Sequence, residues 1–210
     1  MVATDAALGA QLAALGPLER ELLERCIHSS GDLAIAADLR FAPAQLACSQ
    51  GLAALQAGAP ILCDTAMAAA AVAPMARRTL GNRVACLLDW APAVAPPGST
   101  RSAAAVAAAW AELTSALGTA PAPVVLIGSA PTALERLLDV VEAGAPAPSL
   151  VIGMPVGFVG VAESKRRLAG SGLAQLRLEG SKGGAGLVAA ACNALLRHGA
   201  LQAASAPPSP

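Results

Sequence analysis

The sequence is poor in aromatic side chains: among its 210 residues there are two Phe, two Trp and no Tyr. Charged residues make up only 13% of the chain, and the 14 basic residues balance the 14 acidic ones. Domains that bind nucleic acids normally carry a basic surface interleaved with aromatic side chains. The composition therefore argues against a nucleic-acid partner.

Long hydrophobic runs are also missing, although hydrophobic residues account for 55% of the chain. Most of this excess is alanine. The longest apolar stretches, 66–76 and 103–111, fall short of the roughly 18 residues that a membrane span needs. Residues 1–10 lack the basic region of a signal peptide and contain Asp5. We therefore expect a cytoplasmic protein with no membrane partner.

The five cysteines are never closely spaced, and the two histidines have no nearby pairs of acidic residues. This spacing indicates reduced thiols rather than a disulfide framework or a zinc site. The sequence also lacks the G-x-x-x-x-G-K-[ST] phosphate loop, a G-x-G-x-x-G after the first predicted strand, and the G-x-S-x-G nucleophile turn. We therefore predict no metal site and no nucleotide phosphate loop, and the absence of the second motif weakens the case for a dinucleotide.

Short apolar runs alternate with segments of helical length along most of the chain. The predicted strands are 60–63, 84–88, 124–128, 150–153 and 175–178, and the predicted helices are 18–27, 44–57, 65–77, 101–117, 131–143, 161–169 and 184–197. Such alternation predicts βαβ units in a parallel sheet. We expect one three-layer α/β/α domain of about five parallel strands over residues 15–198. Residues 1–14 should be loose and residues 199–210 a disordered tail.

Parallel strands bring their strand-to-helix loops to one edge of the sheet, where α/β proteins usually bind ligands. The unusual residues of this chain follow the five predicted strands, in Asp64–Thr65, Ser99–Ser102, Gly128–Thr132, Met154–Lys165 and Glu179–Gly184. Arg101, Lys165 and Lys182 would then lie on one rim. Such a rim suits a ligand with several carboxylates or phosphates.

Each of these residues also has a simpler interpretation. Ser102 and Ser129 suit helix capping, and Pro131 suits the first position of a helix. The two lysines, taken singly, are typical surface charges. The prediction of a site therefore depends on all five loops sharing one edge.

His28 lies close to the end of the helix predicted over 18–27, beside small polar residues and Asp32. Histidine titrates near neutral pH and commonly transfers protons in enzymes. Position alone favours a structural residue at a helix end and leaves proton transfer as the alternative. His198, in the last turn of the final predicted helix, is explained by its favourable interaction with the helix dipole.

Seven segments between about residue 20 and residue 197 together form a recognisable pattern. They are His28–Asp32, Leu39–Pro43, Gly58–Ile61 with Asp64, Thr100–Arg101, Gly128–Leu134, Pro155–Lys165 and Lys182–Gly184. In order and spacing they resemble the precorrin-8X methylmutases of cobalamin biosynthesis. The string Pro-Val-Gly-Phe-Val-Gly-x-x-Glu-Ser-Lys over 155–165 is the most specific part of the resemblance.

The resemblance implies a homodimeric α/β isomerase that needs no added cofactor and moves a methyl group from C11 to C12 of a corrin-forming macrocycle. The product would be hydrogenobyrinate, or its cobalt form. His28 would correspond to the family's catalytic histidine, a general acid that protonates a ring nitrogen. Gly157 and Gly183 would allow the ligand to approach the backbone closely. The residues expected at the polycarboxylate tetrapyrrole substrate are Asp64, Thr100, Arg101, Ser102, Ser129, Pro131, Thr132, Pro155, Gly157, Phe158, Val159, Glu163, Ser164, Lys165, Lys182, Gly183 and Gly184.

The chain departs from the family's pattern at several positions. Residues 1–17 contain no Arg, Ser or Phe, where the family usually has an Arg-Ser-Phe motif. Ser129 and Ala66 stand where Asn is common, and the segment 179–185 lacks the usual Arg and a Ser after the glycine pair. Losing three or four polar contacts, at about 0.5–1.5 kcal/mol each, would weaken substrate binding by orders of magnitude. A degenerate paralogue that binds or carries a corrinoid or tetrapyrrole is therefore the alternative.

Overall fold

The computed structural model describes residues 9, 12–115, 118 and 120–205. Its helices are α2 (Pro17–Ser30), α3 (Ile35–Asp38), α4 (Ala47–Gln56), α5 (Ala66–Arg78), α6 (Arg101–Ser115), α7 (Pro131–Glu142), α8 (Val161–Gly170) and α9 (Ala185–Ser205), with a short 3-10 helix at Leu87–Trp90. Its strands are β1 (Leu39–Ala42), β2 (Ile61–Cys63), β3 (Val84–Cys86), β4 (Val124–Ile127), β5 (Leu150–Gly153) and β6 (Gln175–Leu178).

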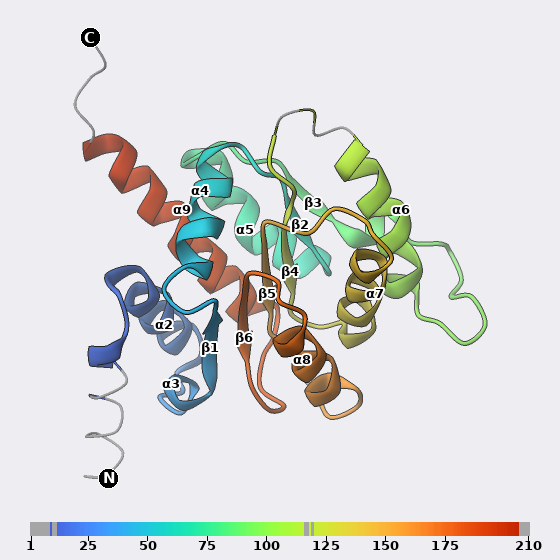
Figure 1. Cartoon of the computed structure of the whole chain (residues 1–210), viewed down its shortest axis with the longest axis horizontal. Helices are drawn as coiled ribbons and strands as arrows, with labels where there is room; N and C mark the ends of the chain where they lie inside the picture. Colours follow the sequence, from blue (N-terminus) through green and yellow to red (C-terminus); the bar gives the residue numbers. More distant parts are fainter. Residues whose placement is uncertain (1–8, 10–11, 116–117, 119, 206–210) are drawn as a thin grey trace.

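The six strands form one sheet in the order β1-β6-β5-β4-β2-β3. Strands β2 to β6 are parallel to one another, and β1 pairs antiparallel with β6 at the edge. Helices cover both faces of this sheet (Figure 1). The predicted three-layer α/β/α fold with five parallel strands is therefore confirmed, and β1 adds a sixth strand.

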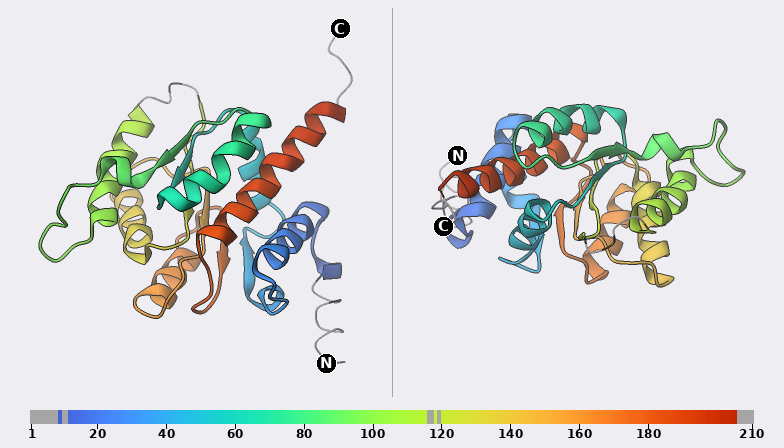
Figure 2. Two further views of the ribbon diagram at one scale, coloured as in Figure 1. Left: turned by 180° about the vertical axis from the view of Figure 1, so that it is seen from behind. Right: turned by 90° about the horizontal axis from the view of Figure 1, so that it is seen from above.

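Two hydrophobic cores lie on opposite faces of the sheet. The larger core packs α2, α4, α5 and α9 against one face, and the smaller core packs α6, α7 and α8 against the other. Seen from behind, α5 and α9 lie side by side across the sheet (Figure 2). Along β4, Val124 and Leu126 enter the larger core while Val125 and Ile127 enter the smaller one. Burial on both faces is what an all-apolar strand of a parallel sheet predicts.

Strand β1 and helix α3 were not among the predicted elements. In β1 only Leu39 and Phe41 contact the larger core, and Arg40 between them forms an ion pair with Glu179 at 3.2 Å. Its sequence Leu-Arg-Phe-Ala is no less apolar than the Gln-Leu-Arg-Leu of β6, which was predicted as a strand. The sequence therefore held a comparable signal for β1, followed by the helix predicted over 44–57, and the prediction missed it.

Helix α9 continues to Ser205, so the expected disordered tail is wrong for residues 199–205. The helix stays packed at Gly199, where a Cβ would lie 3.0 Å from Leu52 and from Leu80, and its last turns are rich in alanine, the best helix former. Residues 12–14 are also helical, whereas 1–8, 10, 11 and 206–210 lie outside the described residues. Within the described chain, α9 included, no helix combines the length and apolarity needed to cross a membrane.

Candidate functional site

The carboxyl ends of β2 to β6 meet at one edge of the sheet because these five strands are parallel. The loops singled out in the sequence therefore share this edge, as predicted. Three of the loops are joined by backbone hydrogen bonds, namely Val156 N to the Gly128 carbonyl (3.2 Å), Gly157 N to the Ser181 carbonyl (3.0 Å) and Gly184 N to the Met154 carbonyl (2.9 Å). The edge is thus one connected backbone structure rather than a set of independent loops.

Asp64 follows β2, where the chain connections change direction because β3 and β4 lie on opposite sides of β2. Ligands commonly enter the crevice at such a point. Here the Asp64 side chain is fully buried, and its Oδ2 accepts backbone N–H bonds from Gly128 (3.0 Å), Ser129 (2.6 Å) and Ala130 (2.9 Å). Burial raises the pKa of this carboxyl, and the three hydrogen bonds partly offset the rise. Asp64 therefore holds the β4–α7 turn, and its burial leaves no direct contact with a substrate at the surface.

Lys165 is also turned inward, with 2% of the residue exposed. Its Nζ donates to the carbonyls of Gly180 at 2.8 Å and Lys182 at 2.6 Å, both in the loop 179–184 between β6 and α9. Ser164 beside it is fully buried and donates to the Val161 carbonyl within α8. The two residues therefore do not lie on the exposed rim where the sequence placed them.

The glycines of the edge mainly allow the loops to pack against one another. A Cβ on Gly183 would collide with the carbonyl groups of Met154 and Pro155, and one on Gly128 would lie 2.7 Å from Ala185 N. Gly157 and Gly184 have φ of 131° and 130°, a region that side chains disfavour. Gly183 thus admits a neighbouring backbone, rather than the ligand expected from the sequence.

Lys182 remains on the surface and connects this edge to the end of α2. Its Nζ lies 2.6 Å from Asp32 Oδ2, with about two-fifths of each side chain exposed. The pairing raises the pKa of Lys182 and lowers that of Asp32. Because Asp32 lies two residues beyond the last residue of α2, this ion pair joins the loop 179–184 to the end of the helix that carries His28.

His28 lies in the last turn of α2 and is exposed, but it lines a hollow of about 320 Å³ between α2, α5 and α9. The remaining lining residues are Arg25, Ser29, Ala71, Gly186, Ala189, Ala190 and Asn193. Gly186 is the second residue of α9, which follows the loop 179–184 without a break. The imidazole therefore stands beside a hollow next to the loop edge.

Two polar residues of this hollow were not singled out in the sequence. Arg25 precedes His28 by three residues, a spacing that places both on one side of a helix and was the available signal. Asn193 of α9 donates from Nδ2 to the Ala71 carbonyl at 3.1 Å, and its position gave no comparable signal. Together they add a cation and an amide to the surroundings of His28.

The loop before α6 meets the start of α7. Thr100 Oγ1 lies 2.7 Å from Thr132 Oγ1 and also accepts from Ala103 N at 3.1 Å, which makes it the cap of α6. Arg101 is exposed and its Nε donates to the Pro92 carbonyl at 2.8 Å. Ser102 is half-buried in the first turn of α6. Thr100 and Thr132 are thus brought together, and Arg101 keeps part of its guanidinium free for other contacts.

The comparisons with known proteins agree with one another. A family model described as CbiC, precorrin-8X methylmutase, matches residues 4–198. The chain belongs to this family. It is 45% identical to the precorrin-8X methylmutase of Pseudomonas aeruginosa over 89% of this chain and 87% of that protein. It is 34% identical to the cobalt-precorrin-8 methylmutase of Synechocystis sp., over 87% and 86%. The solved precorrin-8X methylmutase of Thermus thermophilus has a TM-score of 0.77 at 39% identity, covering 93% of this chain and 91% of that chain.

In this methylmutase the family's most specific string, over 155–165, contains both buried and exposed residues. Pro155 is buried, whereas Phe158 is 93% exposed and Val159 is 89% exposed. Glu163 is exposed and pairs with Arg166 at 3.1 Å within α8. Met67, at the start of α5 on the same edge, is 68% exposed. The edge therefore presents large apolar side chains to the solvent, which suit contact with an apolar ring system.

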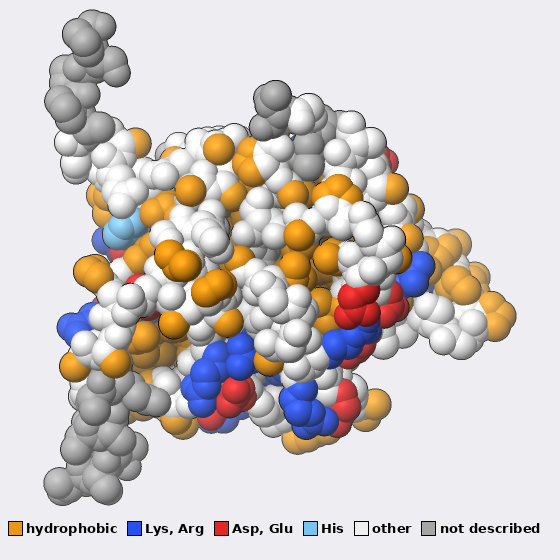
Figure 3. All heavy atoms as spheres, in the orientation of Figure 1, with side chains coloured by type: hydrophobic (Ala, Val, Ile, Leu, Met, Phe, Trp, Pro, Cys, Tyr) orange, Lys and Arg blue, Asp and Glu red, His pale blue; other side chains and the backbone are white. Residues whose placement is uncertain are grey.

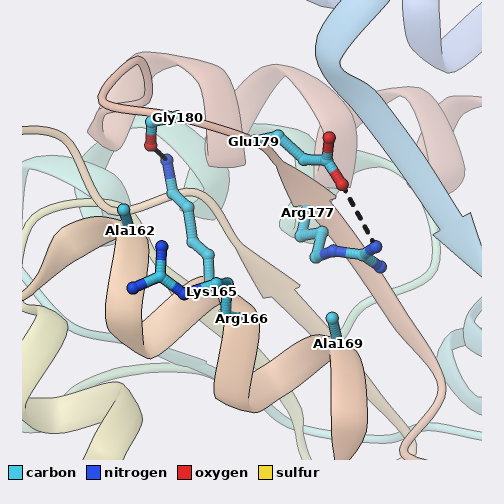
Figure 4. A pocket seen from close by; sticks show the side chains of 7 residues that line it. All are labelled: Ala162, Lys165, Arg166, Ala169, Arg177, Glu179 and Gly180. Carbon is cyan, nitrogen blue, oxygen red and sulfur yellow. Dashed lines mark hydrogen bonds and ion pairs between the residues drawn. The ribbon is translucent and has the colours of Figure 1, made fainter.

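A second hollow of this methylmutase, of about 370 Å³, lies between α8 and β6 (Figure 4). Arg177 in this hollow pairs with Glu179 at 3.4 Å, and Lys165 reaches from α8 to the Gly180 carbonyl. Figure 3 shows basic and acidic side chains gathered in the lower part of this face, over β1, β6 and α8. The hollow is therefore a charged groove beside the loop edge, and its charged side chains are largely paired with one another.

The described part of this methylmutase contains no group of three or more His, Cys, Asp or Glu residues that could hold a metal ion. The five cysteines are buried and free. Burial raises the pKa of the thiols, to about 12 for Cys26 and Cys192. These thiols therefore stay protonated at neutral pH and are poor nucleophiles.

Proposed function

We propose that this member of the methylmutase family moves a methyl group from C11 to C12 of precorrin-8X, or of its cobalt form, with His28 as general acid. The family match over residues 4–198 carries the reaction class. The position of His28, in a hollow beside the loop edge, supports its role. Nothing in the comparisons favours a carrier over an enzyme, since the matched proteins are named as methylmutases.

The proposed methyl shift requires a proton donor and a surface that holds the macrocycle. A protonated imidazole next to the conjugated ring would give its proton to a ring nitrogen and draw electron density toward the carbon that receives the methyl group. Rigid placement of the ring next to this donor lowers the activation barrier by several kcal/mol, because the two groups no longer have to meet by diffusion. Arg25 lines the same hollow and would favour carboxylate arms of the substrate there.

The residues left exposed at the loop edge are the best candidates for holding the remaining parts of the substrate. Arg101 and Lys182 offer charge to the carboxylate arms, and Phe158 and Val159 offer apolar surface to the ring. The neighbouring turns would add weaker contacts with the substrate, through Thr100, Ser102, Ser129, Pro131 and Thr132. We also keep a homodimer and a cytoplasmic location in this proposal, and light scattering of the purified protein tests the dimer.

The test is incubation of the purified protein with precorrin-8X while the visible spectrum is recorded. We expect conversion to hydrogenobyrinate, and a loss of about 10²–10⁴-fold in rate for His28→Ala, which is the range for removal of a general acid. His198→Ala is the matched control, because His198 pairs with Glu21 at 2.9 Å and lies outside the His28 hollow. A spectral shift without conversion, equal in the wild type and in His28→Ala, would instead identify a carrier.

A further inference from the structure

The one buried lysine of the described chain holds a loop instead of a ligand. Lys165 donates to the carbonyls of Gly180 and Lys182 at 2.8 and 2.6 Å, and only 2% of the residue is exposed. Hydrogen bonds from a charged donor are stronger than neutral ones, and an unpaired buried carbonyl is costly. The ammonium therefore fixes the path of the loop 179–184 from beneath.

The loop that Lys165 fixes is also the one that contacts the helix of His28. Lys182 presents its carbonyl to Lys165 Nζ and extends its own Nζ to Asp32 Oδ2 at 2.6 Å. Asp32 N donates to Ser30 Oγ at 3.1 Å, and Asp32 Oδ1 accepts from Ala34 N at 2.9 Å. The contacts thus run without interruption from Lys165 to the last turn of α2.

We propose that Lys165 is a positioning residue for the methyl shift, because its ammonium fixes the loop 179–184 so that Lys182 holds Asp32 and, through it, the end of α2 that bears His28. This inference rests on the proposed function, in which His28 is the proton donor. Misplacing a catalytic group by about 1 Å costs up to about a hundredfold in rate. Lys165 acts through other residues and needs no contact with the substrate.

The protonation state of Lys165 supplies an independent way to weaken the same contacts. Burial removes the ammonium from water and lowers the pKa of Lys165 to about 8, while Asp38 partly opposes the shift. The other charged groups around it, on α8, β6 and the loop, are Arg166, Arg177, Glu179 and Lys182. As the pH rises through about 8, the ammonium becomes a neutral amine, which is a weaker donor to the two carbonyls. Positioning by Lys165 should therefore weaken above this pH.

The test compares Lys165→Met, Lys165→Arg and Lys182→Met with a control, Arg166→Met. Arg166 is the next residue of α8, is exposed, and pairs only with Glu163 among its described ion-pair partners. We expect Lys165→Met to lower kcat by about tenfold to a hundredfold with less than about a threefold change in KM. The double variant Lys165→Met/Lys182→Met should lose little more than the larger single variant, since both act in one series of contacts. Arg166→Met should match the wild type.

The pH profile separates positioning from a merely structural role. Deprotonation of the general acid lowers kcat with rising pH in every variant, so the informative quantity is the ratio of the wild-type kcat to that of Lys165→Arg, which keeps its charge. This ratio should fall as the pH passes about 8, and Lys165→Arg should retain activity. The proposal is overturned if this ratio stays constant as the pH passes about 8, or if the effects of Lys165→Met and Lys182→Met are additive. Lys165→Arg and the wild-type profile keep the test valid if Lys165→Met does not fold.

Amide hydrogen exchange distinguishes failure of this inference from failure of the proposed function. Lys165→Met should raise exchange in residues 179–184 and 28–34, and Arg166→Met should not, whatever reaction the protein performs. If precorrin-8X is not converted but both segments loosen in Lys165→Met, the reaction assignment is wrong and the contacts are right. If conversion is normal and exchange is unchanged in Lys165→Met, the positioning role is wrong.

Discussion

Gly183→Ala tests whether the glycines of the loop edge make room for a backbone or for a ligand. The added Cβ would collide with the Met154 and Pro155 carbonyl groups, which belong to backbone and cannot rotate away. The loop 179–184 would have to move away from the β5–α8 loop. That movement would break or lengthen two hydrogen bonds, Gly184 N to the Met154 carbonyl and Gly157 N to the Ser181 carbonyl.

The magnitude follows from these two effects. Overpacking in a rigid surrounding costs about 1–3 kcal/mol, and each lost hydrogen bond costs about 0.5–1.5 kcal/mol. We therefore expect Gly183→Ala to lower the free energy of unfolding by about 2–6 kcal/mol, a large share of the total for a single domain. Urea denaturation of the protein without ligand measures this difference.

Gly170→Ala is the matched control for that measurement. Gly170 is the last residue of α8, and a Cβ there would have nothing within 4 Å. Because alanine is a better helix former, Gly170→Ala should leave stability unchanged or raise it by up to about 1 kcal/mol. The reasoning is refuted if Gly183→Ala is as stable as the wild type and only its KM changes, since Gly183 would then make room for the ligand.

Two further predictions concern a buried and an exposed residue of the edge. The first is Asp64→Asn. Burial raises the pKa of Asp64 in the folded protein above its ordinary value of 3.8, so between these two pKa values the folded protein holds a proton that the unfolded chain has lost. The contribution of this carboxyl to stability therefore grows as the pH falls toward 3.8. The difference in free energy of unfolding between the wild type and Asp64→Asn should therefore shift in favour of the wild type as the pH falls from 7. Urea denaturation at several pH values measures this difference. A constant difference, or a shift in the opposite direction, contradicts the prediction. The second is Phe158→Ser. Because Phe158 is 93% exposed, the free energy of unfolding of this variant should lie within about 0.5 kcal/mol of the wild-type value. If Phe158 covers the ring, KM should rise about tenfold or more, and an unchanged KM contradicts that contact.

The sequence predicted the sheet well because the physical signal was local. Short apolar runs followed by helical segments are produced by strands buried on both faces, and all five such runs are strands in the structure. The antiparallel edge strand β1 was missed although its Leu-Arg-Phe-Ala pattern is as apolar as the Gln-Leu-Arg-Leu of β6, which was predicted. The continuation of α9 beyond residue 198 was not predicted, because at Gly199 the helix packs against Leu52 and Leu80, which are distant in sequence.

The direction in which each charged side chain of the site points was harder to predict. For Lys165 a signal existed: Val161, Ser164, Lys165 and Leu168 are the buried positions of α8, at the spacing of one helix face. The lysine could therefore have been placed on the buried face from its neighbours alone. For Asp64 no such signal existed, because its three donors come from the loop 128–130, more than 60 residues later in the chain.

This division of the charged residues restricts how a ligand is held. Asp64 and Lys165 are buried and bonded to the loops themselves, so they fix the shape of the edge and leave no charge for direct contact with a substrate. Arg101 and Lys182 remain exposed, and each already has one partner in the protein. A carboxylate arm that bound Lys182 would compete with Asp32 for the same ammonium. Substrate binding at this lysine and retention of the α2 end are therefore coupled through one ion pair, whose strength decreases with added salt because both side chains are exposed.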